Sequence, residues 1–376
     1  MTPARERRKR PGLRAFWREV SDGLTVQQLW GQFRREAGTS VRVYTKDLKP
    51  DAEAERSMKG SLRIARIVFW AVLRKLSPPR RALLLAALLM LVLGGIVHDY
   101  GFAIFGGLAL LALLGLELAD RVAMKRDLEI ARDIQGWLVP QTPPETPGVD
   151  IAFTTRPANT VAGDYYDAFP LPGATGSGGT RRVALVVADV AGKGIPAALL
   201  MAAFQSSLRT LVPEELPLAE LVTRLNRYSC EHSLEGRRFT TAVIAELDPG
   251  TGVLRYVNAG HNPPALRRAN GGIEWLEAGG LPLGIQRDAT YASGAATIGP
   301  GDQLFVYTDG VPDARNEAGD QFEQHRFAAW LATLGATTSA EALGRLIATL
   351  DAFVGDAARE DDITCLVARV TDRSAT

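Results

Sequence analysis

Several aspartates in this sequence lie where an apolar or β-branched run ends, which is where a strand would deliver a side chain to a loop. Asp189 is the clearest case, because it follows the run Leu185–Ala188 and precedes a glycine-rich turn, after which Pro196 opens a helix. An aspartate in such a place can also simply cap the following helix. Three further carboxylates at run edges favour a shared site over that alternative: Asp164, Asp309 and Asp361.

Carboxylates gathered at strand ends form an oxygen-only ligand set. Such a set suits hard divalent ions such as Mg²⁺ or Mn²⁺, which take carboxylate and water rather than thiolate or imidazole. No cluster of Cys or His competes for the role, since the two cysteines, Cys230 and Cys365, stand far apart without a partner motif. Cysteines used so sparingly indicate a reducing compartment.

Five short motifs follow one another in the second half of the chain. They are Gly163-Asp164-Tyr-Tyr-Asp167, Asp189-Val-Ala-Gly-Lys-Gly194, Asn258-Ala-Gly-His-Asn-Pro-Pro264, Thr308-Asp309-Gly310-Val311 and Asp361-Asp362-Ile-Thr364. In this order they resemble the PPM-type metal-dependent serine/threonine protein phosphatases, in their bacterial SpoIIE/RsbU-like branch. The resemblance covers residues from about Arg132 to Val370. Ala162 and Ala191 depart from the family's usual Gly and frequent Ser, but neither change removes a carboxylate.

The resemblance implies a site that holds two divalent ions, Mn²⁺ or Mg²⁺. Asp164 and Asp189 would contact both ions, the backbone carbonyl of Val190 would add a ligand, and Asp309 and Asp361 would complete one shell. Two ions about 4 Å apart can lower the pKa of a bridging water and neutralise the phosphate oxygens that gain charge. Hydrolysis of a phosphate monoester by that water then requires no covalent protein nucleophile.

Other motif residues carry weaker expectations. His261 is either a general acid for the leaving alkoxide or a structural hydrogen-bonding group in its turn. Asp167 and Asp362 are expected to orient the ligand carboxylates or waters. Lys193 either contacts phosphate or is simply solvated, and the glycines on both sides of it are expected where a Cβ would crowd the ions.

Charge is distributed unevenly along the 376 residues, although the net charge is only +1. Residues 1–81 hold 20 Lys and Arg against 8 Asp and Glu, whereas the remaining 295 hold 23 against 34. The basic start includes Arg5–Arg10, which could bind nucleic acid or anionic lipid but is more simply a solvated tail. We therefore expect no nucleic-acid partner.

Two uncharged runs, Ala82–Val97 and Gly101–Leu116, are separated by a very short turn. They predict a hairpin of two membrane-spanning helices, in which Gly94-Gly95 and Gly106-Gly107 permit close approach. Arg63–Lys75 mixes basic and apolar residues and could lie along the lipid surface. Basic residues flank both outer ends, so the N-terminus and the catalytic domain are expected in the cytoplasm of a multi-pass inner-membrane protein. The alternative is a buried hairpin of a soluble protein.

A charged helical stretch, Glu117–Leu138, follows the second run. Met124, Leu128, Ala131 and Leu138 recur at heptad-like spacing, which is compatible with a homodimeric coiled coil but equally with a passive tether. The expected organisation is a basic N-terminal region (1–81), two spans (82–116), a linker helix (117–140) and a phosphatase domain (141–376).

The catalytic region alternates strand and helix patterns typical of an α+β domain. Expected strands are Asp150–Thr155, Val183–Ala188, Thr241–Leu247, Val253–Asn258, Gln303–Tyr307 and Ile363–Val370. Expected helices are Ala197–Leu211, Leu218–His232, Phe322–Leu334 and Ala340–Val354, and Pro172–Thr180 is expected to be a flexible loop. Short connections favour antiparallel pairing, and the family resemblance implies a four-layer αββα sandwich of two antiparallel sheets.

Three functions are consistent with these observations. The first is a membrane-anchored phosphatase acting on phosphoserine or phosphothreonine of a cytoplasmic regulatory protein; the resemblance suggests a phosphorylated antagonist of an anti-sigma factor. The second is a catalytically inactive scaffold, against which the four retained carboxylates argue. The third is a two-metal hydrolase of a small phosphoester, for which the sequence offers no Gly-x-x-x-x-Gly-Lys-Ser/Thr loop.

Overall fold

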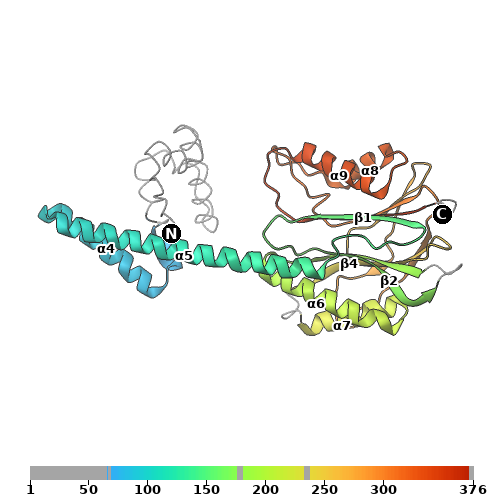
Figure 1. Cartoon of the computed structure of the whole chain (residues 1–376), viewed down its shortest axis with the longest axis horizontal. Coiled ribbons are helices and arrows are strands. Elements are labelled where there is room, and N and C mark those ends of the chain that lie inside the picture. Colours follow the sequence, from blue (N-terminus) through green and yellow to red (C-terminus); the bar gives the residue numbers. More distant parts are fainter. Residues whose placement is uncertain (1–65, 67–68, 176–180, 233–237, 372–376) are drawn as a thin grey trace, which may run out of the picture. The chain divides into compact units, whose positions relative to one another are not determined.

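The computed structural model describes residue 66 and residues 69–175, 181–232 and 238–371 (Figure 1). The chain forms two compact units, Met1–Arg121 and Val122–Thr376. The basic stretch Arg5–Arg10 lies outside the described residues, as do residues 176–180 of the expected loop.

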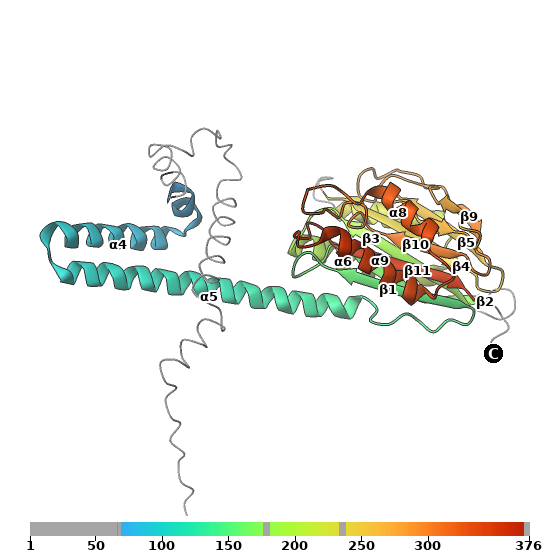
Figure 2. The same cartoon turned by 90° about the horizontal axis from the view of Figure 1, so that it is seen from above.

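The first unit contains a hairpin of apolar helices (Figure 2). Helix α4 (Pro78–Val97) starts on a proline pair and ends where His98 adopts a left-handed φ of 56°. Helix α5 (Tyr100–Leu138) then begins at once, and both helices are long and apolar enough to cross a membrane. The second expected span and the linker are therefore one uninterrupted helix.

Glycines set the closest approach of the two helices. A Cβ at Gly106 would lie 2.9 Å from the carbonyl oxygen of Ala87, and one at Gly94 would lie 2.9 Å from the amide nitrogen of Ala103. The second glycine of each pair would meet no described atom within 4 Å, so only one member of each pair is needed for contact. At the open end, the Arg80 guanidinium donates to the carboxylates of Glu117 at 2.9 Å and Asp120 at 2.6 Å.

A third stretch, Ile195–Glu214, also has the length and hydropathy of a membrane span. It comprises α6 (Ile195–Leu211) and the 3₁₀ turn η2 (Val212–Glu214). One face of α6 is buried in the core of the second unit through Ala197, Met201, Phe204 and Leu208. Its apolar character thus serves packing within a folded domain.

The second unit is a sandwich of two sheets between two pairs of helices (Figure 1). Sheet A has the order β1-β11-β10-β6-β7, and its strands are β1 (Val149–Arg156), β6 (Ala265–Arg267), β7 (Ile273–Trp275), β10 (Gln303–Tyr307) and β11 (Ile363–Val370). Sheet B has the order β2-β3-β4-β5-β8 with β9 also paired to β5, and its strands are β2 (Tyr165–Thr175), β3 (Arg181–Val190), β4 (Thr240–Leu247), β5 (Val253–Ala259), β8 (Gly279–Gly280) and β9 (Gly294–Thr297). Helices α6 and α7 (Leu218–His232) cover sheet B, whereas α8 (Glu323–Thr333) and α9 (Ser339–Val354) cover sheet A.

This architecture confirms the expected four-layer αββα class. All strand pairs are antiparallel except the short β5–β8 pair, which is parallel. Strand β3 shows why its sequence is apolar throughout: Val183, Leu185 and Val187 face the other sheet, and the residues between them face α6 and α7. Both faces are covered, so the strand needs no polar alternation.

Two sequence-based expectations need correction. Residues 172–175, expected in a flexible loop, continue β2 through an irregularity in its pairing with β3. Strand β2 was not expected, because Pro170, Pro172 and Gly173 interrupt its apolar pattern. Strands β6 to β9 were not expected either, because runs of two to four residues carry too little periodicity to be recognised.

His261 is a buried residue in the turn that follows β5, and its side chain forms a hydrogen bond to strand β4. Its Nδ1 shares a hydrogen bond of 2.8 Å with the Thr241 hydroxyl, and Thr241 is the register partner of Asp189. Asn258 closes the turn, because its side chain accepts from the His261 amide at 2.7 Å and donates to the His261 carbonyl at 2.9 Å. Burial lowers the pKa of His261 to about 4, so the imidazole is neutral at pH 7. This arrangement favours the structural role over the general acid.

Replacing His261 by Asn should change how stability depends on pH. The folded-state pKa of His261 is about 4, whereas the ordinary value is about 6.5. As the pH falls, the unfolded chain therefore binds the proton first. The contribution of His261 to the free energy of unfolding then falls by about 3 kcal/mol between pH 6.5 and pH 4. We expect the His261→Asn protein to melt lower than wild type at pH 7, by a margin that narrows on acidification. Scanning fluorimetry of the full chain in detergent measures this.

The control is His325→Asn, since His325 is exposed beside Glu323. It should leave both the melting temperature and its pH dependence unchanged. Parallel pH curves for wild type and His261→Asn would contradict the assignment.

Candidate active site

The four aspartates predicted from strand ends converge at one edge of the sandwich. Asp164 directly precedes β2, and Asp189 is the last residue but one of β3. Asp309 lies two residues beyond β10, and Asp361 lies two residues before β11. Because β2 pairs with β3 and β10 with β11 in antiparallel fashion, the beginning of one strand lies beside the end of the next. Each sheet therefore supplies two carboxylates to the same edge.

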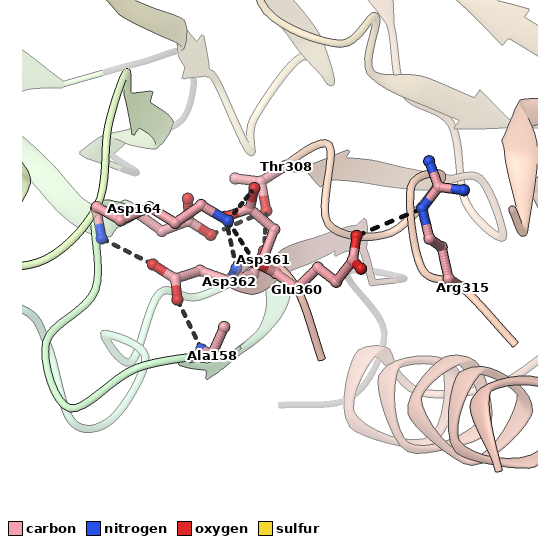
Figure 3. Close-up of polar contacts among 9 residues, drawn as sticks. Ala158, Asp164, Thr308, Arg315, Glu360, Asp361 and Asp362 are labelled. Carbon is pink, nitrogen blue, oxygen red and sulfur yellow. Dashed lines mark hydrogen bonds and ion pairs between the residues drawn. The ribbon is translucent and has the colours of Figure 1, made fainter. Parts of the chain in front are cut away.

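Asp164 is buried and is tied to the opposite sheet. Its Oδ2 accepts a hydrogen bond of 2.9 Å from the Thr308 hydroxyl (Figure 3). Thr308 in turn accepts from the Thr364 amide at 3.0 Å, and its own amide donates to the Thr364 carbonyl at 3.0 Å. Sequence analysis gave Thr308 no role, because a threonine beside an aspartate carries no distinctive signal.

Asp362 fixes the loop that leads to Asp164. Its two carboxylate oxygens accept from the amides of Ala158 at 2.7 Å and Gly163 at 2.8 Å (Figure 3). Hydrogen bonds from backbone N–H groups to an ionised carboxylate are among the stronger ones in proteins. Asp362 thus orients a neighbour of the site by holding the backbone that carries it.

The carboxylates at this edge repel one another. Burial, reinforced by the charge of Asp189, raises the pKa of Asp164 well above its usual range. Burial and the charges of Asp309 and Asp361 raise the pKa of Asp189 to about 7. The pKa of Asp309 is also raised, again by burial first and by Asp361 second. The cluster has an excess of negative charge that Lys193 offsets only in part, and such an excess favours binding of a cation.

The donor chemistry fits a hard divalent ion, since the groups that face one another are carboxylate and carbonyl oxygens. A Cβ at Gly163 would lie 3.2 Å from the Val190 carbonyl oxygen, so this glycine brings the loop before Asp164 close to that expected ligand. Among the described residues, however, no three acidic, histidine or cysteine side chains form a ready-made metal cluster. The Asp361 carboxylate pairs with Lys193.

Lys193 and two arginines line a cavity of about 140 Å³ beside the carboxylates. The Lys193 ammonium lies 3.0 Å from Asp361 Oδ2 and also donates to the Glu360 carbonyl. Arg315 pairs with the Glu360 carboxylate at 3.4 Å (Figure 3). Arg359, which pairs with Asp351 at 3.3 Å, also lines the cavity, and Asp313, Glu360 and Asp361 balance the three cations. The arginines were missed by sequence analysis because they lie outside the five motifs.

The glycines on both sides of Lys193 have backbone conformations that favour glycine. Gly192 and Gly194 have φ values of 113° and 75°, a region that L-residues rarely adopt. A Cβ at Gly194 would meet no described atom within 4 Å, and one at Gly192 would meet the Arg238 guanidinium rather than a carboxylate. Backbone conformation is therefore sufficient to select glycine at both positions.

Asp167 has partners that differ from the expected ones. Its buried Oδ2 accepts from the Tyr165 hydroxyl at 2.5 Å and pairs with Arg209 of α6 at 2.7 Å. None of these groups is an expected metal ligand, so Asp167 attaches α6 to sheet B. Cys365 is buried, and Cys230 is half-buried.

The profile of the family described as Stage II sporulation protein E (SpoIIE) matches residues 179–371. Over 282 residues the chain is 29% identical to Protein IcfG of Synechocystis sp., covering 68% of this chain and 43% of the relative. Over 197 residues it is 29% identical to the phosphoserine phosphatase RsbU of Bacillus subtilis, covering 52% of this chain and 56% of the relative. The chain spans about half the length of these curated relatives.

Solved structures share the sandwich. The SiaA-PP2C domain of Pseudomonas aeruginosa aligns with a TM-score of 0.57 and 22% identity, covering 68% of this chain and 99% of that one. The PP2C domain of SpoIIE from Bacillus subtilis, with a fragment of its regulatory domain, aligns with a TM-score of 0.51 and 18% identity, covering 59% of this chain and 64% of that one. The fold and the family profile agree with the resemblance found in the motifs. The chain belongs to the SpoIIE family of PPM-type, PP2C-fold phosphatases.

Proposed function

We propose that the chain is a membrane-anchored, metal-dependent protein phosphatase that hydrolyses phosphoserine or phosphothreonine on a cytoplasmic regulatory protein. The observation that carries this proposal is the convergence of carboxylates from both sheets, with pKa values raised by burial and mutual repulsion. The name of RsbU, a phosphoserine phosphatase, supports the reaction class. A purely structural scaffold would have no need to keep so unfavourable a cluster.

In this proposal Asp164, Asp189, Asp309, Asp361 and the Val190 carbonyl hold two divalent ions, Mn²⁺ or Mg²⁺. Bound ions would activate a water for attack on phosphorus and neutralise the phosphate oxygens. The chain itself positions the carboxylates. Thr308 fixes the Asp164 carboxylate, and the hydrogen bonds of Asp362 fix the loop before Asp164.

The proposed substrate is a phosphorylated side chain of another protein. More specifically, we propose that this protein is an antagonist of an anti-sigma factor. The cavity beside the carboxylates measures about 140 Å³, whereas sites for small molecules typically enclose about 300–1,000 Å³. A single phosphorylated side chain suits this space better than a nucleotide does. Arg315 and Arg359 in its wall would attract the phosphate charge.

Removing one expected ligand should abolish turnover. Asp189→Ala and Asp309→Ala should each lower phosphate release from a phosphoserine peptide with Mn²⁺ by about 100-fold or more, since even groups behind the ligands matter 10–100-fold. The fold should survive, because each change relieves carboxylate repulsion. Phosphate release by the full chain in detergent, with and without a chelator, provides the measurement.

Cys230→Ser serves as the control and should retain turnover, because Cys230 is half-buried on α7. Full activity of Asp189→Ala at saturating Mn²⁺ would refute the ligand assignment. Wild type that releases no phosphate would favour the scaffold, and release from small phosphoesters alone would favour the small-molecule hydrolase.

We further propose that α4 and the first part of α5 anchor the chain in the inner membrane, in contact with lipid and with both chain ends in the cytoplasm. Basic residues at the start of α4 and again at 121–126 support that orientation. Apolar side chains that point away from the hairpin, such as Ile96, Ile104 and Phe105, are 60–69% exposed and suit a lipid surrounding.

A reporter fused after Thr376 should therefore read as cytoplasmic, and one inserted between His98 and Asp99 should read as external. Paired fusions of an enzyme active only in the cytoplasm and one active only outside would check this. Cleavage of the catalytic domain by protease added to intact cells would overturn it.

The end of α5 contacts the loop that carries the site. The Gln135 side chain donates to the Ala162 carbonyl at 2.7 Å and accepts from the Ala162 amide at 3.0 Å. Ala162 stands two residues before Asp164, so rotation of this helix end would disturb a proposed metal ligand. We propose on this basis that the linker helix controls activity rather than acting as a tether.

The residues available for a homodimer contact on the linker helix differ from those expected. Of the expected seam residues, Leu128, Ala131 and Leu138 are half-buried on this chain, and Met124 is exposed. Another apolar row at i, i+4 and i+7 is open to solvent, with Ile130, Ile134 and Trp137 exposed by 49%, 48% and 83%. We propose this second row as the dimer seam.

Activity should depend on the helical phase of the linker. One residue inserted after Lys125 rotates the downstream helix by about 100°, whereas seven nearly restore its phase. We expect the single insertion to lower specific activity strongly and the seven-residue insertion to restore most of it. Phosphatase assays together with light scattering in detergent measure both effects. If both insertion variants were equally active and the protein were monomeric, the linker helix would be only a passive tether.

A further inference from the structure

Lys193 lies where a cation is expected. Its ammonium is 3.0 Å from Asp361 Oδ2 and also donates to the Glu360 carbonyl. It stands between Gly192 and Gly194, two residues with left-handed φ values, on the loop that directly follows Asp189 and Val190. A lysine of the chain thus already contacts one of the carboxylates assigned to the metal site.

The charge of Lys193 reaches beyond its ion pair. Burial raises the pKa of Asp309 and of Asp362, and the positive charge of Lys193 opposes that rise. Arg315 lines the same cavity, but it pairs with Glu360, which is not an expected ligand. The two cations therefore differ in which carboxylate they neutralise, although they share one cavity.

We propose that Lys193 is an internal counter-ion that competes with a divalent cation for Asp361, so that metal loading displaces the ammonium from this carboxylate. The proposal rests on the proposed function in taking Asp361 as a ligand. It assigns Lys193 a task that differs from both phosphate contact and simple solvation.

The competition follows from charge and exposure. An ammonium and a divalent ion on one carboxylate repel each other, so Lys193 must weaken metal binding unless it moves away. Both side chains of the pair are about half exposed, at 50% and 46%. Exposed ion pairs contribute little stability, so the ammonium leaves at small cost. The carboxylate is thereby kept neutralised when no metal is bound, without being blocked.

The test is Mn²⁺ affinity of the metal-stripped full chain in detergent, measured by isothermal titration calorimetry. Lys193→Met removes the charge and keeps the chain length, and we expect its Mn²⁺ Kd to fall about two- to fivefold, as for the loss of an exposed ion pair. Lys193→Arg keeps the charge and should bind as wild type does. The gain for Lys193→Met should shrink as ionic strength rises from about 0.05 to 0.5 M, because salt screens the repulsion.

Arg315→Met is the matched control, since it removes a cation from the same cavity but not from Asp361. It should leave the Kd unchanged. An unchanged or raised Kd in Lys193→Met, or an equal gain in Arg315→Met, would overturn the competition. Circular dichroism shows whether each variant has kept its fold.

Binding and turnover separate the two proposals. Wild type that binds Mn²⁺ but releases no phosphate would overturn the proposed function while the Kd comparison still decides the role of Lys193. Wild type that binds no Mn²⁺ would overturn the competition itself.

Discussion

The carboxylates at one edge of the sandwich repel one another, and the fold must hold them together against this repulsion. Left to themselves, Asp164, Asp189 and Asp309 would separate or become protonated, as their raised pKa values indicate. The fold holds them by attaching each to a strand whose other residues are buried on two faces. Core packing thus supplies the free energy that keeps an unfavourable electrostatic arrangement in place.

Hydrogen bonds then join the sheets where the core cannot. Thr308 of sheet A donates to Asp164 at the start of sheet B, and Asp362 accepts from the loop before it. His261 supports the strand end at Asp189 through Thr241. None of these three groups is an expected ligand, yet they determine where the ligands lie. Changes to them would alter the site through geometry rather than through chemistry.

The sequence allowed the long elements and the four aspartates to be predicted, because both depend on local patterns. Strand patterns of five to eight residues, rich in apolar and β-branched side chains, predicted β1, β3, β4, β5, β10 and β11 to within about two residues, and α7 was predicted at its observed bounds. Tertiary contacts explain what was missed. Strands β2 and β6 to β9 lack a clear strand pattern of their own and are recognised by their pairing with other strands. The partner of Asp167 on α6 is 42 residues away in the chain. The continuity of α5 was missed because a change in composition at Glu117 resembles a boundary, although nothing there interrupts a helix.

The order of strands in sheet A has a consequence for synthesis of the chain. Strand β11 is the last in sequence, yet it lies between β1 and β10. The carboxylate of Asp362 reaches back 199 residues to Gly163 and 204 to Ala158. At about 5–20 residues per second, a ribosome needs roughly 10–40 s to cover that separation. Until then sheet A lacks the strand between β1 and β10 and the loop before Asp164 lacks its anchor, so the site of the nascent chain is incomplete. Loss of β11 would leave every residue assigned to the site in the polypeptide but would remove the strand that joins β1 to β10.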